Sequence, residues 1–309
     1  MTHPVPLVEI VRSGLREGMH HGDVVVLDPD GSTRLALGDV DSPMYPRSAL
    51  KPAQSAGMLR AGLELPAEDL ALATASHSGE EGHVAAVRAL LERFELSTAD
   101  LRCPPDWPMN EAARDARDAK LRVTMNCSGK HAGMLAACAR NGWSTSDYLA
   151  ISHPLQRTIA STVAEMAGEP IANTAVDGCG APLFAVSLTG LARVFQNLVG
   201  AHRPVAEAMR AHPWLVSGTG REDARLMPAV DGLVSKIGAE GVFAFALPDG
   251  RAAAIKISDG ADRARLPVAV GVLRHLGASG DLDDLAELPV YGGGEPVGSV
   301  RLLPGALES

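Results

Sequence analysis

Residues 44–59 read MYPRSALKPAQSAGML and mark the point where strand-like sequence gives way to a long run of helical patterns. If a helix begins near Ser48, Pro52 falls in its first turn, where proline removes no helical hydrogen bond. Ser48 and Lys51, three residues apart, would then share one face of the helix. Small residues that predict tight packing and burial follow along it: Ala49, Ala53, Ala56 and Gly57.

Strand-like stretches lie on both sides of a helical block. Residues 6–38 hold two apolar runs around Asp28-Pro29-Asp30-Gly31, and residues 235–258 hold two runs around Pro248-Asp249-Gly250, so turn chemistry predicts a hairpin in each. The tail after residue 285 is rich in Gly and Pro and is either a last short strand or a loose end. Apolar spacing predicts helices over residues 82–94, 129–142, 154–168, 181–198 and 261–278, with Gly142 and Gly168 as C-caps.

The order of strands, helical block, strands and helix predicts an α/β (α+β) fold. The simplest packing joins the N- and C-terminal strands in one antiparallel sheet with flanking helices and places the mostly helical part beside it as an insertion. We expect residues 1–47 and 216–309 to form the sheet-containing subdomain and residues 48–215 the mainly helical one. An active site would lie at their junction.

Composition narrows the class of protein. The chain has 309 residues, of which 46% are hydrophobic and 21% charged, as in a globular protein. A net charge of −9 argues against nucleic-acid binding, and the lack of an apolar run near 18 residues argues against a membrane span. The N-terminus shows no signal-peptide pattern, so we expect a cytoplasmic protein whose four cysteines are reduced.

The Ser48-x-x-Lys51 pattern matters because lysine is scarce in this chain. Of 28 basic residues only five are lysines, namely Lys51, Lys120, Lys130, Lys236 and Lys256. A buried helix start is electropositive and offers N–H groups to an oxyanion, which suits a serine nucleophile. A lysine beside it can act as general base once uncharged, which arginine cannot. The alternative is a capping serine beside a surface lysine.

Further candidates lie in loops that precede helices. Ser76 ends an apolar segment and is expected to face a cleft. NCSGKHAGML holds Cys127, Lys130 and His131, and VDGCGAP holds Asp177 and Cys179. The two cysteines either share a metal ion with a third group or are structural thiols, since no C-x-x-C spacing is present.

The second strand region supplies a possible far wall of the cleft. Lys236-Ile237-Gly238 begins a strand, and Gly238 would let a substrate approach the backbone. Lys256 with Asp259 fits an ion pair at a strand end. LVSGTGRED, residues 215–223, is a turn by composition and a possible substrate loop.

Taken together, these stretches resemble a known family. PRSALKPAQ, ASHSGE, NCSGKHAGML, VDGCGAP, SGTGR and KIGAEGV span residues 46–242. In this order they resemble the zinc-associated bacterial L-asparaginases of the Rhizobium etli type, the asparaginase II family. The resemblance implies a serine β-lactamase/glutaminase-like fold, which agrees with the order of elements.

The resemblance also implies roles for residues. Ser48 would be the nucleophile and Lys51 its base, and Ser76 with Lys236 would form a second Ser/Lys pair, Lys236 being preferred to Lys256. One Zn²⁺ would be bound by Cys127, Lys130 and Cys179 with a water molecule. The residues implied around the substrate are Arg47, His131, Asp177 and Gly238.

The implied reaction is hydrolysis of the side-chain amide of L-asparagine to L-aspartate and ammonia through a serine acyl-enzyme. A glutaminase or another serine amidohydrolase of the same fold is the first alternative. A non-catalytic protein that binds zinc and an amino acid is the second. A homodimer is also implied, while substrate preference and the need for zinc stay open.

Overall fold

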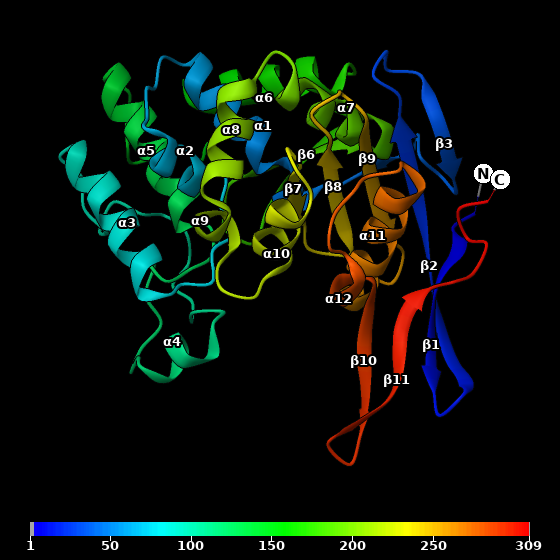
Figure 1. The fold of residues 1–309 in the computed structure, drawn as a ribbon. Helices are drawn as coiled ribbons and strands as arrows, with labels where there is room; N and C mark the ends of the chain where they lie inside the picture. The colour runs from blue at the N-terminus through cyan, green and yellow to red at the C-terminus, as the bar shows by residue number, and fades with distance from the viewer. Residues whose placement is uncertain (1–2, 309) are drawn as a thin grey trace.

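The computed structural model of the protein describes residues 3–308, and its centre is an antiparallel sheet (Figure 1). The strands of this sheet are β1 (Val5–Arg12), β2 (Leu15–Leu27), β3 (Thr33–Leu37), β7 (Val234–Ile237), β8 (Val242–Ala246), β9 (Ala252–Ile257), β10 (Glu287–Gly292) and β11 (Glu295–Leu302). Strands β7, β8 and β9 at its middle and edge are buried along almost their whole length, and turn-forming Gly and Asp residues join neighbouring strands into hairpins.

The sheet joins the two ends of the described chain, as the sequence predicts. Its order is β10-β11-β1-β2-β9-β8-β7, with β3 paired to β2. Strand β1 pairs with β11, so that Val8 lies opposite Leu302, and β2 pairs with β9. Strand β7 has β8 as its neighbour on one side and leaves its other edge for the helical part.

The helical part follows β4 (Pro43–Met44) and lies beside the sheet (Figure 1). It opens with a short 3₁₀ helix, η1 (Arg47–Leu50), that runs directly into α1. Its α-helices are α1 (Lys51–Arg60), α2 (Ala67–Ala73), α3 (Glu81–Arg93), α4 (Glu111–Asp115), α5 (Ser128–Asn141), α6 (Pro154–Ala167), α7 (Leu188–Val199), α8 (Arg203–Ala211), α9 (Pro213–Ser217) and α10 (Glu222–Ala229).

Three expectations about elements are corrected. Residues 181–198 are not one helix, because Pro182–Ser187 forms strand β6, which pairs with β5 (Asn173–Val176) and β4. Strand β6 is buried on both faces, and such a strand has no periodicity that separates it from a buried helix. Residues 235–246 form two strands, β7 and β8, and the tail forms two strands, β10 and β11.

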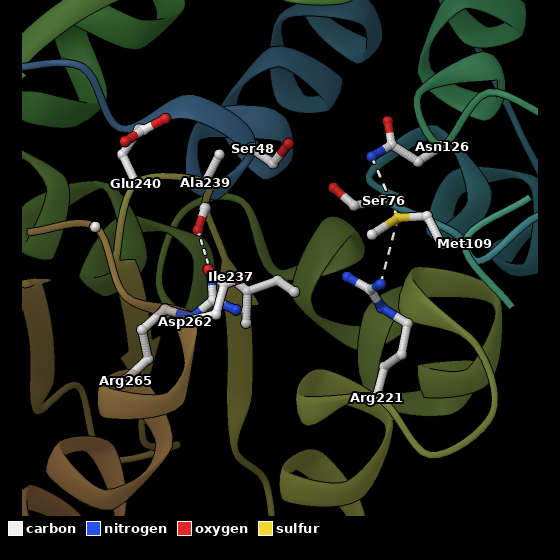
Figure 2. A pocket seen from close by; sticks show the side chains of 12 residues that line it. Ser48, Ser76, Met109, Asn126, Arg221, Ile237, Ala239, Glu240, Asp262 and Arg265 are labelled. Carbon is white, nitrogen blue, oxygen red and sulfur yellow. Dashed lines mark hydrogen bonds and ion pairs between the residues drawn. The ribbon is translucent and has the colours of Figure 1, made fainter. Parts of the chain in front are cut away.

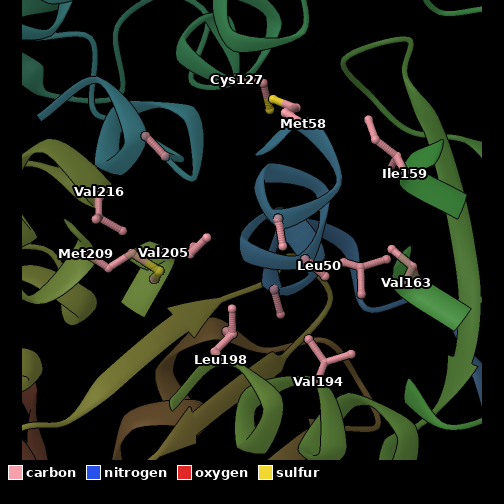
Figure 3. Close-up of a cluster of buried hydrophobic side chains, with 14 of the residues drawn as sticks. Leu50, Met58, Cys127, Ile159, Val163, Val194, Leu198, Val205, Met209 and Val216 are labelled. Atoms are coloured by element: carbon pink, nitrogen blue, oxygen red, sulfur yellow. The ribbon is translucent and has the colours of Figure 1, made fainter. Parts of the chain in front are cut away.

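Helix α1 is buried as its small residues predict. Residues from Lys51 to Met58 are all buried, and Gly57 lies against the Ile159 backbone of α6, where a Cβ atom would come within 2.8 Å of the Ile159 Cα. Figure 3 shows α1 surrounded by apolar side chains from several other helices, including Ile159, Val194 and Met209. The nucleophile candidate is therefore held on a rigid element.

Helices also cover both faces of the main sheet. Helix α7 contacts β2, β8 and β9, while α11 (Arg265–His275), preceded by the 3₁₀ turn η2 (Asp262–Ala264), contacts β9, β11, β1 and β8. The short helix α12 (Asp283–Ala286) leads into β10. In the described part of the chain, no helix combines the length and the hydropathy that crossing a bilayer requires.

Candidate active site

A cavity of about 440 Å³ opens between η1, the segment after α2 and the free edge of β7 (Figure 2). Ser48 and Ser76 both line it, and Figure 2 shows their hydroxyl groups turned toward the same part of the cavity. The two hydroxyls predicted to share a cleft are therefore brought together. The other lining residues are Met109, Asn126, Arg221, Ile237, Gly238, Ala239, Glu240, Gly260, Asp262 and Arg265.

Ser48 follows a residue with an unusual backbone conformation. Arg47 has a φ angle of 53°, in the left-handed region that non-glycine residues seldom adopt. Such conformations persist where the surrounding structure holds them, and they are frequent at active sites. Among residues 3–308 the backbone N–H groups of Ser48 and Ala239 have no hydrogen-bond partner, so both are available beside the cavity.

Lys51 carries a buried amine whose hydroxyl partner is Ser76 rather than the expected Ser48, since no hydrogen bond joins Lys51 to Ser48 within residues 3–308. Its side chain is 1% exposed, and Nζ lies 2.6 Å from the Ala75 carbonyl oxygen and 2.8 Å from Ser76 Oγ. Ser76 is itself fixed, because its N–H donates to the Val216 carbonyl at 2.9 Å. Within the described chain Lys51 forms no ion pair with Asp or Glu, so its partners are neutral oxygens.

Lys236 lies on β7 and is fully buried, but its partner is a carboxylate rather than the expected Ser76. Nζ lies 3.0 Å from Asp223 Oδ2 and donates to the Ile237 carbonyl at 3.3 Å. Burial lowers the pKa of Lys236 to about 8, although Asp223 favours the charged form. Charge on Lys51 adds to the lowering, so the two amines influence each other.

Lys256, the other lysine weighed for the second pair, does not line the cavity. It donates to the Glu240 and Ile257 carbonyls at 2.7 and 2.6 Å. The expected pair of Lys256 with Asp259 is wrong, since Asp259 lies 2.6 Å from His20 Nδ1. Lys236 does not line the cavity either, but its charge interacts with that of Lys51, so it is the better placed of the two.

Gly238 allows β7 to lie close to the start of the nucleophile helix. A Cβ atom there would lie 2.5 Å from the Pro46 carbonyl oxygen and 3.3 Å from the Ala49 nitrogen. Any side chain would push the strand away from Ser48. The glycine predicted to permit a close approach does so, toward the protein's own backbone.

The candidate metal ligands come from two neighbouring segments. Cys127 precedes α5, Lys130 lies in its first turn, and Cys179 lies in the turn between β5 and β6. Lys130 Nζ is 3.2 Å from Cys179 Sγ, and all three side chains are buried. Interaction with Cys127 and with the Lys130 ammonium lowers the pKa of Cys179, so this sulfur has thiolate character.

This donor set suits zinc in its chemistry. Sulfur and nitrogen are the ligands that zinc prefers, and a thiolate is the binding form of cysteine. In the part of the chain that the structure describes, no three His, Cys, Asp or Glu side chains form a metal group, so zinc here would need the Lys130 amine. Although burial disfavours the charged form, the neighbouring sulfur and carboxylate groups raise the pKa of Lys130, so the ammonium would have to lose its proton when zinc binds. Asp177 Oδ2 lies 3.8 Å from Cys179 Sγ, close to this set.

Arg47, one of the residues implied around the substrate, lies between the cavity and the candidate metal ligands. Arg47 donates to Asp177 Oδ1 at 2.8 Å and lies 3.6 Å from Glu240. His131 Nδ1 is 2.6 Å from the Tyr148 hydroxyl, and its Nε2 has no hydrogen-bond partner among the described residues. Asp223 and Arg221 were not anticipated as individual residues, although SGTGR was singled out as a possible substrate loop.

The cleft thus combines a buried amine, two serine hydroxyls and free backbone N–H groups. An amidohydrolase that acts through a serine uses these groups as base, nucleophile and oxyanion donors. The sequence model of the L-asparaginase II family matches residues 8–302, and the chain belongs to this family. No match is found among curated proteins.

Two solved structures show a distant similarity. A β-lactamase from Mycobacterium bovis is 16% identical, with a TM-score of 0.46, over 82% of this chain and 94% of that one. A provisionally named β-lactamase from Bacteroides dorei is 15% identical, with a TM-score of 0.45, over 82% and 93%. At these scores we base no argument on either similarity.

Proposed function

We propose that the protein is an L-asparaginase that hydrolyses the side-chain amide of L-asparagine through an acyl-enzyme on Ser48. The observation that carries the proposal is the buried Lys51 amine, held against the Ser76 hydroxyl at the edge of the cavity that Ser48 lines. Family membership supports amide hydrolysis as the class of reaction. We further expect a cytoplasmic homodimer.

In the first half-reaction Ser48 Oγ bonds to the amide carbon of the substrate. Its proton passes to Lys51, and the carbonyl electrons move onto oxygen. The free N–H groups of Ser48 and Ala239 are the candidates to stabilise that oxyanion. The C–N bond then breaks, and the leaving nitrogen takes the proton from Lys51 as ammonia.

In the second half-reaction water attacks the acyl carbon and gives one proton back through Lys51. The Ser48–acyl bond breaks, and L-aspartate and the free hydroxyl are formed. Lys236, as an ammonium, would add positive charge to the site while negative charge develops on the substrate oxygen. Lys51 must be uncharged whenever it accepts a proton.

Cys127, Lys130 and Cys179 would hold a zinc ion beside this site. The ion would help to orient the amino-acid end of the substrate. The hydrogen bond between Arg47 and Asp177 would hold the loop that carries Cys179 against the segment that carries Ser48.

The test compares ammonia release by the wild type, Ser48→Ala and a matched control, Ser55→Ala. Ser55 lies on α1, the helix that directly follows η1; it is buried and its hydroxyl has no partner in the described residues, so its loss should leave turnover unchanged. Ser48→Ala should fold and lose turnover by about 10³-fold or more. Near-normal ammonia release from Ser48→Ala would rule out this mechanism.

The same assay with L-glutamine separates the alternatives. Faster turnover of L-glutamine than of L-asparagine would make the protein a glutaminase. A wild type that binds L-asparagine and zinc but releases no ammonia would be a binding protein.

A further inference from the structure

Arg221 differs from the other arginines around the cleft. Arg265, on the opposite wall, is already paired with carboxylates, at 2.9 Å from Asp262 and 3.2 Å from Glu222. Arg47 is paired with Asp177 at 2.8 Å. Although Arg265 Nε is also buried without a partner among the described residues, both guanidinium groups have their charge matched by carboxylates of the protein itself.

Arg221, by contrast, forms no ion pair within residues 3–308, although it lines the cavity. Its Nη1 donates to the Met109 sulfur at 3.3 Å, and its Nε is buried without a partner. A thioether is a weak acceptor, so much of the hydrogen-bonding capacity of this cation is unused. An unmatched arginine in a cleft is costly unless a ligand completes it.

The loop that carries Arg221 is held rigidly. Gly218 has a φ angle of 110°, and a side chain there would collide with Ser78. Glu80 accepts hydrogen bonds from the Thr219 N–H at 2.9 Å and from its hydroxyl at 2.7 Å. The guanidinium is therefore presented to the cavity by a fixed turn, which reduces the entropy lost when a ligand binds.

The opposite wall offers the complementary charge. Glu240 lines the same cavity and is 67% exposed, with Arg47 only 3.6 Å away as a partner. In Figure 2 Arg221 and Glu240 lie on opposite sides of the cavity, with the Ser48 side chain between them. A small zwitterion could thus reach a cation on one wall and an anion on the other.

We infer that Arg221 binds the α-carboxylate of the amino-acid substrate and so positions the side-chain amide against Ser48. The inference rests on the proposed function and adds the residue that makes the enzyme prefer substrates with an α-carboxylate. A guanidinium presents paired donors that match a carboxylate, and a carboxylate would displace the Met109 sulfur from it. Glu240 then faces the α-amino group.

The experiment uses three substrates that differ at the ends. L-asparagine has both charged groups, succinamate lacks the α-amino group, and 3-aminopropanamide lacks the α-carboxylate. The variants are Arg221→Gln, Arg221→Lys, and Arg225→Gln as a control, because Arg225 is exposed and lies one turn further along α10. Thermal melts check that each variant is folded.

Arg221→Gln should lower kcat/KM for L-asparagine and succinamate by roughly 10- to 100-fold, mainly through KM, as expected for a lost charged hydrogen bond. Turnover of 3-aminopropanamide should change by less than about threefold. Arg221→Lys should recover part of the loss, and Arg225→Gln should behave as the wild type. Equal losses on all three substrates, or no loss on L-asparagine, would overturn the inference.

A binding measurement separates this inference from the proposed reaction. If the wild type releases no ammonia, calorimetry with L-aspartate still tests Arg221. A Kd raised about 10-fold or more in Arg221→Gln supports carboxylate binding even though the proposed function has failed. An unchanged Kd, or no binding to the wild type at millimolar L-aspartate, would overturn it.

Discussion

Lys51 Nζ lies 2.8 Å from Ser76 Oγ, although the two residues are 25 positions apart and come from different segments. Helix α1 supplies the amine, and the extended segment after α2 supplies the hydroxyl. At this distance a proton can pass between them without movement of either side chain. The two residues should therefore act as one unit.

A double-mutant cycle tests that unit. Lys51→Met and Ser76→Ala should each lower kcat by about 10²- to 10⁴-fold, and the double variant should be little worse than the poorer single one. Lys51→Arg should fail as well, because arginine cannot release its proton. Lys120→Arg is the control, since Lys120 is exposed beside Asp106. Losses that simply multiply would show that the two side chains act independently.

The pH dependence of kcat/KM should reflect the titration of the Lys236 amine. Burial lowers the pKa of Lys236 to about 8, so the ammonium predominates below this pH and the neutral amine above it. Since the proposal uses the ammonium, kcat/KM should fall as the pH rises through about 8. Lys236→Met should be less active and lack this descending step, whereas Lys256→Met should keep it. A descending step that persists in Lys236→Met would show that another group is responsible for it.

Metal analysis should find about one zinc per chain if Cys127, Lys130 and Cys179 are its ligands. Cys179→Ala should lose the metal, and Cys138→Ala, which alters a buried cysteine elsewhere on α5, should keep it. Removal of zinc by a chelator should weaken substrate binding more than it lowers the Tm. Global unfolding on chelation would identify a structural site instead.

Gly238→Ala should lower both the stability and the activity of the enzyme, although Gly238 lies on the wall of the cleft opposite the serine hydroxyls. The new Cβ would crowd the Pro46 carbonyl and the Ala49 nitrogen, so we expect a loss of about 1–3 kcal/mol in the free energy of unfolding together with lower kcat. Gly18→Ala is the control, because its Cβ would meet only the end of the Ile10 side chain at 3.2 Å. Denaturant unfolding and ammonia release measure the two effects. Wild-type values for both would show that the strand can move without consequence.

Local patterns in the sequence predicted much of the fold. Gly142 and Gly168 end α5 and α6 in the left-handed conformation, with φ angles of 64° and 68°, as their positions indicate. The turn at Asp28–Gly31 joins β2 to β3. These features depend on neighbouring residues, so the chain itself specifies them.

The parts that the sequence could not predict depend on distant partners. Nothing near Lys236 in the sequence indicates that Asp223 would replace Ser76 as its partner, because that contact is set by how α10 packs on β7. Strand β6 was taken for helix because an apolar run buried on both faces has no periodicity. The role inferred for Arg221 depends on which carboxylates the other arginines already occupy.

The pairing of β1 with β11 also has a consequence for biosynthesis. Val8 leaves the ribosome long before its partner Leu302, so β1 stays without this neighbour until β11 has been synthesised. The helical part that carries Ser48 and Lys51 emerges before β7, which bears Lys236 and Gly238. A nascent chain thus exposes its serine and amine without the opposite wall, and turnover should begin only after β7 has emerged and paired.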